Sequence, residues 1–130
     1  MTPTRESAAE ALELAGKIAL QLRASRRTIA VAESLTSGML SARLGAAPEA
    51  SEWFRGGVVA YAPEVKFTVL GVPEGPVVTA SCASAMASGV ARLMLADVGI
   101  GITGVGGPGS EEGRAAGAVW SPVGVVTESA

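Results

Sequence analysis

The chain has 130 residues, a formal net charge of -2 and a pI of about 5.1, with 48% hydrophobic but only 4% aromatic residues. This length predicts one domain over residues 1–130, large enough to bury a core. A composition rich in Ala, Val, Leu and Gly favours helices packed closely on a sheet. The sequence has no basic cluster that could neutralise many phosphates, so we expect no direct contact with nucleic acid.

The residue types that are missing exclude several kinds of active site. The chain has no His and a single cysteine, Cys82. Ser-His-Asp and Cys-His sites are therefore impossible within it, as are zinc sites built from His or paired Cys, and we expect neither a metal nor a cofactor. One cysteine cannot form an internal disulfide, and no segment resembles a signal peptide or the roughly 20 apolar residues of a membrane helix. These features predict a soluble, cytoplasmic protein without membrane contact.

The first part of the sequence alternates helical and strand patterns. Apolar residues at helical spacing predict a helix over Glu6–Ala24. The run Thr28–Ala32, rich in β-branched residues, predicts a buried strand. Ser34–Ser37 forms a polar corner, which opens a helix predicted over Met39–Leu44.

The alternation continues to the end of the chain. A second strand is predicted over Gly56–Tyr61, followed by one or two helical turns over Glu64–Leu70. Thr79 is a suitable N-cap for a helix that reaches about Leu95, and an apolar run follows over Val98–Val105. The segments Ala118–Trp120 and Val123–Thr127 are candidate closing strands, and Trp53 and Phe54 are expected to fill a core or a subunit contact. Strands that alternate with helices predict an α/β sandwich with a largely parallel or mixed sheet.

Three polar or glycine-rich segments follow the predicted strands: Glu33–Gly38, Tyr61–Lys66 and Thr103–Gly109. In open α/β sheets, ligands bind in the crevice at the carboxyl ends of the strands. We therefore expect these three segments to converge on one site.

Ser34 and Lys66 are the candidate nucleophile and base. A hydroxyl at a strand-to-helix corner can face a ligand, and the amides of the following turn can stabilise an oxyanion. Without His, a serine needs another base, and a lysine whose pKa is lowered by burial can serve, with Tyr61 relaying the proton. The alternatives are that Ser34 or Thr36 only caps a helix, that Lys66 is a solvated helix residue, and that Tyr61 is a half-buried sheet residue.

The glycine-rich segment Gly104–Gly109 is a candidate anion site. Its backbone N–H groups could approach a phosphate or a carboxylate, Thr103 could reach the same crevice, and Arg114 could bind a phosphate. The segment lacks both the Walker pattern and the dinucleotide fingerprint. The alternatives are an ordinary turn and a surface arginine.

Three stretches together indicate a family: AESLTSG at Ala32–Gly38, GGVVAYAPEVKFTVLGV at Gly56–Val72 and DVGIGITGVGGPG at Asp97–Gly109. In this order they resemble the C-terminal domain of the competence/damage-inducible protein CinA. That family also occurs as a stand-alone nicotinamide-nucleotide amidase. The resemblance covers most of Thr28–Trp120 and implies a three-layer α/β/α sandwich with a mixed, largely parallel sheet.

The resemblance also implies a reaction, the hydrolysis of the carboxamide of nicotinamide mononucleotide to nicotinate mononucleotide and ammonia, without a metal. In the matched motifs Ser34 is the nucleophile, Lys66 the base and Tyr61 an assisting residue. The expected substrate-binding residues are Glu33, Thr36, Thr103, Gly104, Gly106, Gly107 and Arg114. The alternative is a non-catalytic module that binds a nucleotide or a protein partner in the same crevice.

The sequence departs from the family pattern at several motif positions. These are Leu35 in place of Cys, Ser37 in place of the first paired Gly, Ala62 and Pro63 in place of Ser-Asn, Gly106 in place of Ala, and Arg114-Ala115 in place of Lys-Pro. Members of the family continue with a further strand, a Gly-Asp-Arg segment and a long helix, whereas this sequence ends at Ala130. We therefore expect an incompletely covered sheet face and a homo-oligomer, a dimer or higher.

Overall fold

The computed structural model describes residues 16–104, 119–120 and 127–128. Its main sheet has the strand order β2-β1-β3-β6. Strands β1 (Ile29–Glu33), β2 (Phe54–Val59) and β3 (Val98–Gly101) are parallel, and β6 (Thr127–Glu128) pairs with β3 in the antiparallel direction. The predicted mixed, largely parallel sheet is confirmed, with β1 flanked by strands on both sides.

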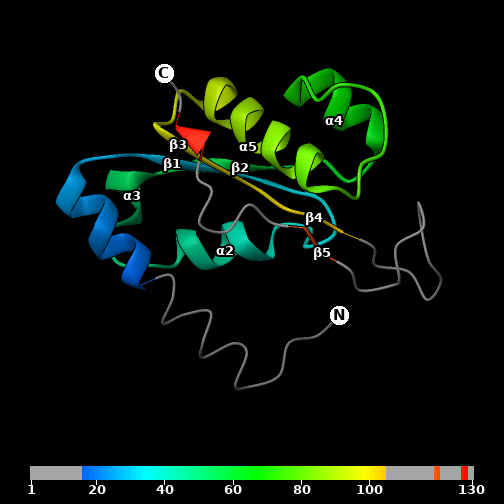
Figure 1. The fold of residues 1–130 in the computed structure, drawn as a ribbon. Helices are drawn as coiled ribbons and strands as arrows, with labels where there is room; N and C mark the ends of the chain where they lie inside the picture. The colour runs from blue at the N-terminus through cyan, green and yellow to red at the C-terminus, as the bar shows by residue number, and fades with distance from the viewer. Residues whose placement is uncertain (1–15, 105–118, 121–126, 129–130) are drawn as a thin grey trace.

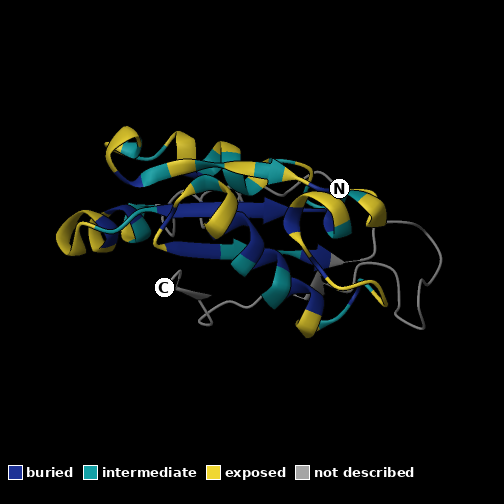
Figure 2. Cartoon of the chain, turned by 90° about the horizontal axis from the view of Figure 1, so that it is seen from above, coloured by how far each residue is buried: buried dark blue, intermediate teal, exposed yellow. Residues whose placement is uncertain are grey.

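Helices cover both faces of this sheet (Figure 1). On one face lie α4 (Pro63–Leu70) and α5 (Ala80–Met94), and on the other lie α2 (Met39–Gly45) and a helix over residues 16–25. Viewed from above, the central strands are buried while the helices expose their outer sides (Figure 2). The expected three-layer α/β/α sandwich is therefore confirmed. None of the described helices is long and apolar enough to cross a membrane.

The residues of β1 contribute alternately to two cores, and all five of them are buried. Ala30 and Ala32 pack into the core under α4 and α5. Ile29 and Val31 pack into the opposite core, with the helix over residues 16–25, α2 and the buried Trp53. This division follows from the two-residue period of a strand, which points successive side chains to opposite faces. By the same alternation, Glu33 faces α2.

Helix α5 begins and packs as its small-residue composition suggests. The hydroxyl of Thr79, its N-cap, accepts a hydrogen bond from the amide of Cys82 at 3.0 Å, so the predicted cap is confirmed. The backbone of α5 lies directly against β3, where a Cβ added at Gly99 or Gly101 would collide with carbonyl oxygens of the helix. Glycine at these two positions thus allows the closest approach between helix and sheet.

The structure corrects the predicted boundaries around β2. This strand spans Phe54–Val59, not Gly56–Tyr61, so Tyr61 lies beyond its end. A short helix that the sequence analysis did not predict, α3 (Ala50–Trp53), leads directly into it. Trp53 is buried, and its indole Nε1 donates a hydrogen bond to the carbonyl of Pro48 at 3.1 Å, so burial of the indole accompanies this turn of helix.

The apolar run Val98–Val105 is divided between two sheets. After β3, the strand β4 (Thr103–Gly104) pairs in the antiparallel direction with β5 (Val119–Trp120), in a separate two-stranded sheet. The predicted closing strands are thus represented by β5 and β6 in the described part of the chain. Of the predicted first helix, only the portion from residue 16 onward is described.

Candidate active site

The carboxyl ends of the three parallel strands lie side by side at one edge of the main sheet. The amide of Ala60, just after β2, donates to the carbonyl of Glu33 at 2.7 Å. The amide of Ile102, just after β3, donates to the carbonyl of Ala32 at 2.9 Å. The residue that follows β1, Ser34, therefore lies between the segments that follow β2 and β3.

Ser34 begins a tight turn that leads into α2. Its side chain is largely buried, with 6% of the residue exposed, and its carbonyl accepts the amide of Ser37 at 3.0 Å. Ser37 and Gly38 both adopt positive φ values, 50° and 99°. The N-cap of α2 is Gly38 and has no side-chain hydrogen bond, so the alternative that Ser34 or Thr36 caps this helix is wrong.

The amides within this turn are the candidate oxyanion donors. The amides of Ser37 and Met39 donate to carbonyls inside the turn, at 3.0 Å each. Within the described residues, the amides of Leu35, Thr36 and Gly38 donate to no protein group. Donors of this kind, next to a nucleophile, can stabilise negative charge on an attacked carbonyl.

Glu33 is fully buried, and its carboxylate contacts the beginning of α2. Oε1 accepts the amide of Leu40 at 3.0 Å, and Oε2 accepts the amide of Ser41 at 2.9 Å and the hydroxyl of Ser41 at 2.6 Å. Burial raises the pKa of Glu33. The hydroxyls of Ser41 and nearby Thr36, together with the two amides, lower this pKa by more than burial raises it, so the net shift is downward. The family resemblance predicts a substrate contact for Glu33, whereas in the structure its carboxylate oxygens bind α2.

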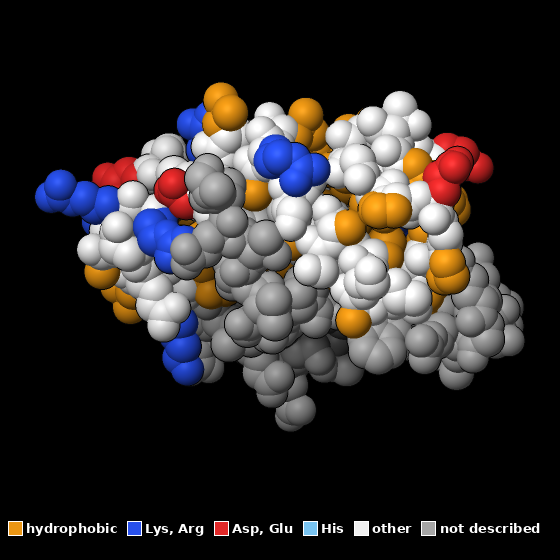
Figure 3. All heavy atoms as spheres, turned by 45° about the horizontal axis from the view of Figure 1, so that its top comes forward, with side chains coloured by type: hydrophobic (Ala, Val, Ile, Leu, Met, Phe, Trp, Pro, Cys, Tyr) orange, Lys and Arg blue, Asp and Glu red, His pale blue; other side chains and the backbone are white. Residues whose placement is uncertain are grey.

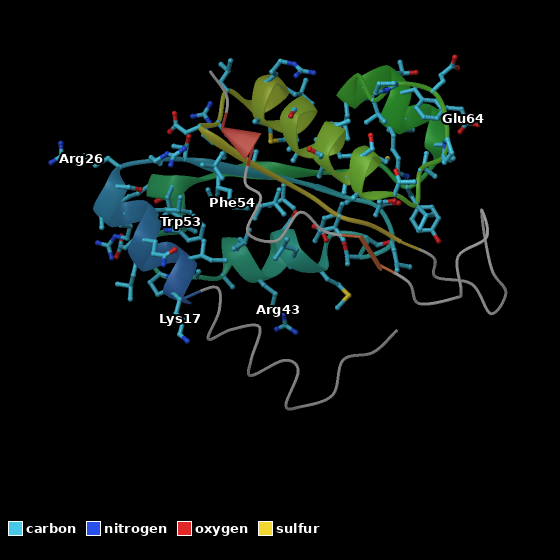
Figure 4. All side chains as sticks on the ribbon, in the orientation of Figure 1. Lys17, Arg26, Arg43, Trp53, Phe54 and Glu64 are labelled. Atoms are coloured by element: carbon cyan, nitrogen blue, oxygen red, sulfur yellow. The ribbon has the colours of Figure 1, made fainter. Side chains whose placement is uncertain are left out.

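Lys66 is also buried, with 1% of the residue exposed, so the alternative of a solvated lysine is wrong. It lies in α4, and its Nζ donates a hydrogen bond at 2.9 Å to the carbonyl of Tyr61. The contact is therefore with the backbone of Tyr61, whose side chain is exposed at 61% of the residue rather than half-buried in the sheet. By contrast, the other lysine of the chain, Lys17, is exposed and points away from the fold (Figure 4).

Two threonine hydroxyls are buried at this edge. The hydroxyl of Thr103 donates to the carbonyl of Val77, in the loop before α5, at 2.7 Å. The Oγ1 atom of Thr36 is buried and makes no hydrogen bond of good geometry within the described residues. Gly104 follows Thr103 in β4. The other expected substrate-binding residues, Gly106, Gly107 and Arg114, lie outside the part of the chain that the structure describes.

Exposed apolar side chains accompany these polar groups. Met39, Val59 and Tyr61 are exposed large hydrophobic residues at or next to the ends of α2 and β2. A Cβ placed at Gly38 would be 3.7 Å from Val59 Cγ2, so the beginning of α2 and the end of β2 are adjacent. This edge therefore offers both hydrogen-bonding groups and apolar surface, the usual combination in a small-molecule site.

Ser41 is a member of this arrangement that was not predicted from the sequence. Its hydroxyl, in the first turn of α2, makes the shortest of the three hydrogen bonds to the Glu33 carboxylate described above. The available signal was weak, because Ser41 lies eight residues after Glu33 and this spacing matches no local capping pattern. Only the reversal of the chain between β1 and α2 brings the two side chains together.

Sequence comparison identifies relatives of known family. The model of the CinA C-terminal domain family matches residues 11–129. A putative competence-damage inducible protein of Desulforamulus reducens is 47% identical over 107 residues, and one of Listeria welshimeri is 46% identical over 100 residues. The matches cover 75% and 73% of this chain but 26% and 24% of those proteins, so the chain spans about a quarter of the curated relatives' length.

Solved structures of the same superfamily share the fold. A CinA superfamily protein from Klebsiella pneumoniae superposes with a TM-score of 0.80 at 35% identity, covering 85% of this chain and 73% of that one. One from Escherichia coli has a TM-score of 0.80 at 26% identity, covering 100% of this chain and 82% of that one. Family match, sequence identity and fold agree, and the chain belongs to the CinA C-terminal domain family.

Proposed function

We propose that this domain is a nicotinamide-nucleotide amidase, which hydrolyses nicotinamide mononucleotide to nicotinate mononucleotide and ammonia. One observation carries the proposal: a buried serine directly follows one parallel strand, and a buried lysine of α4 binds the backbone just beyond the end of the neighbouring strand. Ser34 directly follows β1, and Lys66 Nζ binds the carbonyl of Tyr61, two residues after the end of β2. A serine and a lysine form a nucleophile and base that need no His, which this chain lacks.

In the proposed reaction, the uncharged amine of Lys66 takes the hydroxyl proton of Ser34 while Oγ attacks the carboxamide carbon. Free amides of the turn after Ser34 stabilise the negative charge on the carbonyl oxygen. Lys66 then gives its proton to the amide nitrogen, and the C–N bond breaks. Ammonia departs, and the acyl group remains bound to Ser34 as an ester. A water molecule, deprotonated by Lys66, hydrolyses this ester and releases the carboxylate. The burial of Lys66 and its contact with the backbone just after β2 support this role.

The surroundings suit a pyridine nucleotide. The exposed ring of Tyr61 supplies an aromatic face for a cationic aromatic ring, and Met39 and Val59, at the ends of α2 and β2, add exposed apolar surface at the same edge. Tyr61 would thus bind the pyridine, and its phenol could also assist proton transfer, as the family resemblance implies. Thr103 and Gly104 follow β3 at the same edge, and Gly106, Gly107 and Arg114 remain the proposed ligands of the phosphate.

The test is ammonia release from nicotinamide mononucleotide by the wild type and two variants. Ser34→Ala and Lys66→Met should each lower kcat by about a thousandfold or more, since each removes a group that acts in the transition state. Ser81→Ala and Lys17→Met change exposed residues of the same types and serve as controls. Thermal unfolding of every variant checks that the fold is kept. Unchanged turnover in Ser34→Ala would overturn the proposal.

A non-catalytic binding module is the second candidate, favoured by the replacements Leu35 and Ser37 in the turn that carries Ser34. Such a module would bind nicotinamide mononucleotide in calorimetry without releasing ammonia. Binding without turnover by a folded wild type would therefore support this candidate over the amidase.

We also propose that the domain forms a homo-oligomer. Several large hydrophobic residues are exposed, including Leu20, Leu93 and Leu95. Figure 3 shows hydrophobic side chains at separate places on the side of α4 and α5. Leu93 and Leu95 lie two residues apart at the end of α5, and exposed apolar side chains that are close together suit contact with a second copy. Light scattering that gives the mass of one chain at micromolar concentration would contradict this proposal.

A further inference from the structure

The carboxylate of Glu33 is unavailable to a ligand. The residue is 0% exposed, and both of its oxygens accept hydrogen bonds from the first turn of α2, at Leu40 and Ser41. A substrate could reach these oxygens only if the beginning of α2 moved away and the amides of Leu40 and Ser41 lost their acceptor. That loss would cost more than one new hydrogen bond returns.

These hydrogen bonds hold both ends of the turn that carries Ser34. Glu33 belongs to β1, its partners belong to α2, and residues 34–38 connect the two. Within the turn, Ser37 and Gly38 are consecutive residues with positive φ, and Ser37 is a non-glycine residue in the left-handed region. Such a conformation persists only when the surroundings impose it. The contact between Glu33 and α2 is one such constraint, and it lies next to the nucleophile.

The same contact decides which amides can act on the substrate. The amides of Leu40 and Ser41 are occupied by Glu33 and cannot bind an oxyanion. The remaining donors are the amides of Leu35, Thr36 and Gly38, which lie in the turn itself. Their direction depends on the conformation of the turn, and so on the contact that fixes its ends.

We infer that Glu33 is a positioning residue, which holds Ser34 and the oxyanion donors in place through α2 and does not bind substrate. This inference rests on the proposed function. It differs from the expectation that the glutamate preceding the serine is a substrate ligand. It also assigns a part to Ser41, whose hydroxyl completes the contact at 2.6 Å.

The experiment compares Glu33→Gln, Ser41→Ala and the exposed control Glu49→Gln for kcat, KM and the affinity for nicotinamide mononucleotide. Glu33→Gln replaces one acceptor oxygen with an NH₂ group that faces a donor, so kcat should fall about 100-fold, as for a nucleophile displaced by about 1 Å. The dissociation constant should stay within about twofold of wild type, because no ligand contact is lost. Ser41→Ala should show the same pattern at about tenfold, and Glu49→Gln no change.

Two outcomes would overturn the inference. A rise in the dissociation constant of tenfold or more with kcat unchanged would make Glu33 a substrate ligand. A loss of thermal stability with kcat and KM unchanged in both Glu33→Gln and Ser41→Ala would leave it with a purely structural role. If Glu33→Gln does not fold, Ser41→Ala alone still separates these outcomes, because it keeps the carboxylate and removes a single bond.

Amide hydrogen exchange separates a failure of this inference from a failure of the proposed function. In Glu33→Gln or Ser41→Ala, exchange should become faster at Leu40, Ser41 and Ser37, but not at Val90 in the middle of α5. If the wild type releases no ammonia, the proposed function fails, while faster exchange at Ser37 still supports the positioning of the turn. Unchanged exchange at Ser37 would overturn the inference whatever the enzyme activity.

Discussion

Two carboxylates join neighbouring elements at opposite ends of the main sheet. At the carboxyl end, Glu33 binds two amides and a hydroxyl at the beginning of α2. At the amino end, just before β3, Asp97 Oδ2 accepts the amide and the hydroxyl of Thr28, just before β1, at 2.8 and 3.1 Å. The chemistry is the same, but Glu33 is buried and Asp97 is exposed.

The difference in burial predicts that the two contacts contribute differently to stability. When an exposed carboxylate is removed, water can replace it at the freed donors, so the cost is small. When a buried one is removed, its partners remain unpaired. The buried contact of Glu33 also lies next to Ser34, whereas Asp97 lies at the other end of the strands, away from the candidate site.

Removal of the buried carboxylate should have the largest effect. Glu33→Ala leaves the amides of Leu40 and Ser41 without their acceptor, and we expect the free energy of unfolding to fall by about 2–4 kcal/mol. Urea denaturation followed by circular dichroism measures this, with Glu49→Ala as an exposed control. An effect no larger than that of the control would break the comparison at its first step.

Acid should weaken both contacts, because hydrogen bonding lowers both pKa values. The pKa of Glu33 lies below its ordinary 4.5; that of Asp97 lies below its ordinary 3.8, chiefly through the amide of Thr28, then its hydroxyl and the charge of Arg27. Each contribution is therefore complete above the ordinary value and disappears as the pH falls through the lowered one. Urea midpoints of wild type and Glu33→Ala, measured from about pH 7 to about pH 2, should converge at the acidic end. A difference between the two midpoints that persists at the acidic end would mean that the ionised carboxylate of Glu33 is not the source of the added stability.

Asp97→Asn should have a smaller effect than Glu33→Ala. The carboxamide retains one acceptor oxygen for Thr28, and solvent reaches the site. We expect a small decrease in the urea midpoint relative to wild type, and added salt should make this difference smaller still. Ammonia release should not change. A loss of activity at constant stability would show that the amino end of the sheet also affects the site.

Ser37→Gly should have the smallest effect and the opposite sign. Glycine removes the strain of a side chain at φ 50°, worth about 1 kcal/mol, but loses the long hydrogen bonds of the Ser37 hydroxyl, at 3.3 and 3.4 Å. We expect a net gain below about 1 kcal/mol in urea denaturation. Combined with Glu33→Gln, the gain should be smaller, because a turn released from α2 is already less strained. Strict additivity would mean that Glu33 does not constrain the turn.

The order of elements was predictable from local patterns. The β-branched run before Ser34, the hydroxyl of Thr79 and the glycines after Leu70 mark element ends by chemistry that acts over a few residues. The start of β2 was not predictable in this way. Residues Ala50–Trp53 form α3 because this conformation buries the indole of Trp53 and lets it donate to the carbonyl of Pro48. The core that buries the indole is built from distant parts of the chain, so local patterns do not reveal it.

The candidate site was predictable in its residues but not in its contacts. Sequence reasoning identified Ser34 and Lys66 as candidates for one site. It did not predict that Lys66 binds the backbone of Tyr61 or that Glu33 binds α2, since both contacts depend on where the chain reverses direction. An acidic residue in a motif suggests a ligand contact. Only the fold shows that the carboxylate of Glu33 is buried and that its partner is α2.

The close packing of α5 against Gly99 and Gly101 should be visible in a mutational scan of this domain. Any side chain at either position meets the helix backbone, so almost every substitution should be lost from a library selected for activity. In such a scan, substitutions at these two glycines would be tolerated as poorly as substitutions at a nucleophile, although the reason is packing against α5. A parallel selection for abundance would separate them from Ser34, whose replacement by alanine should leave the amount of folded protein unchanged.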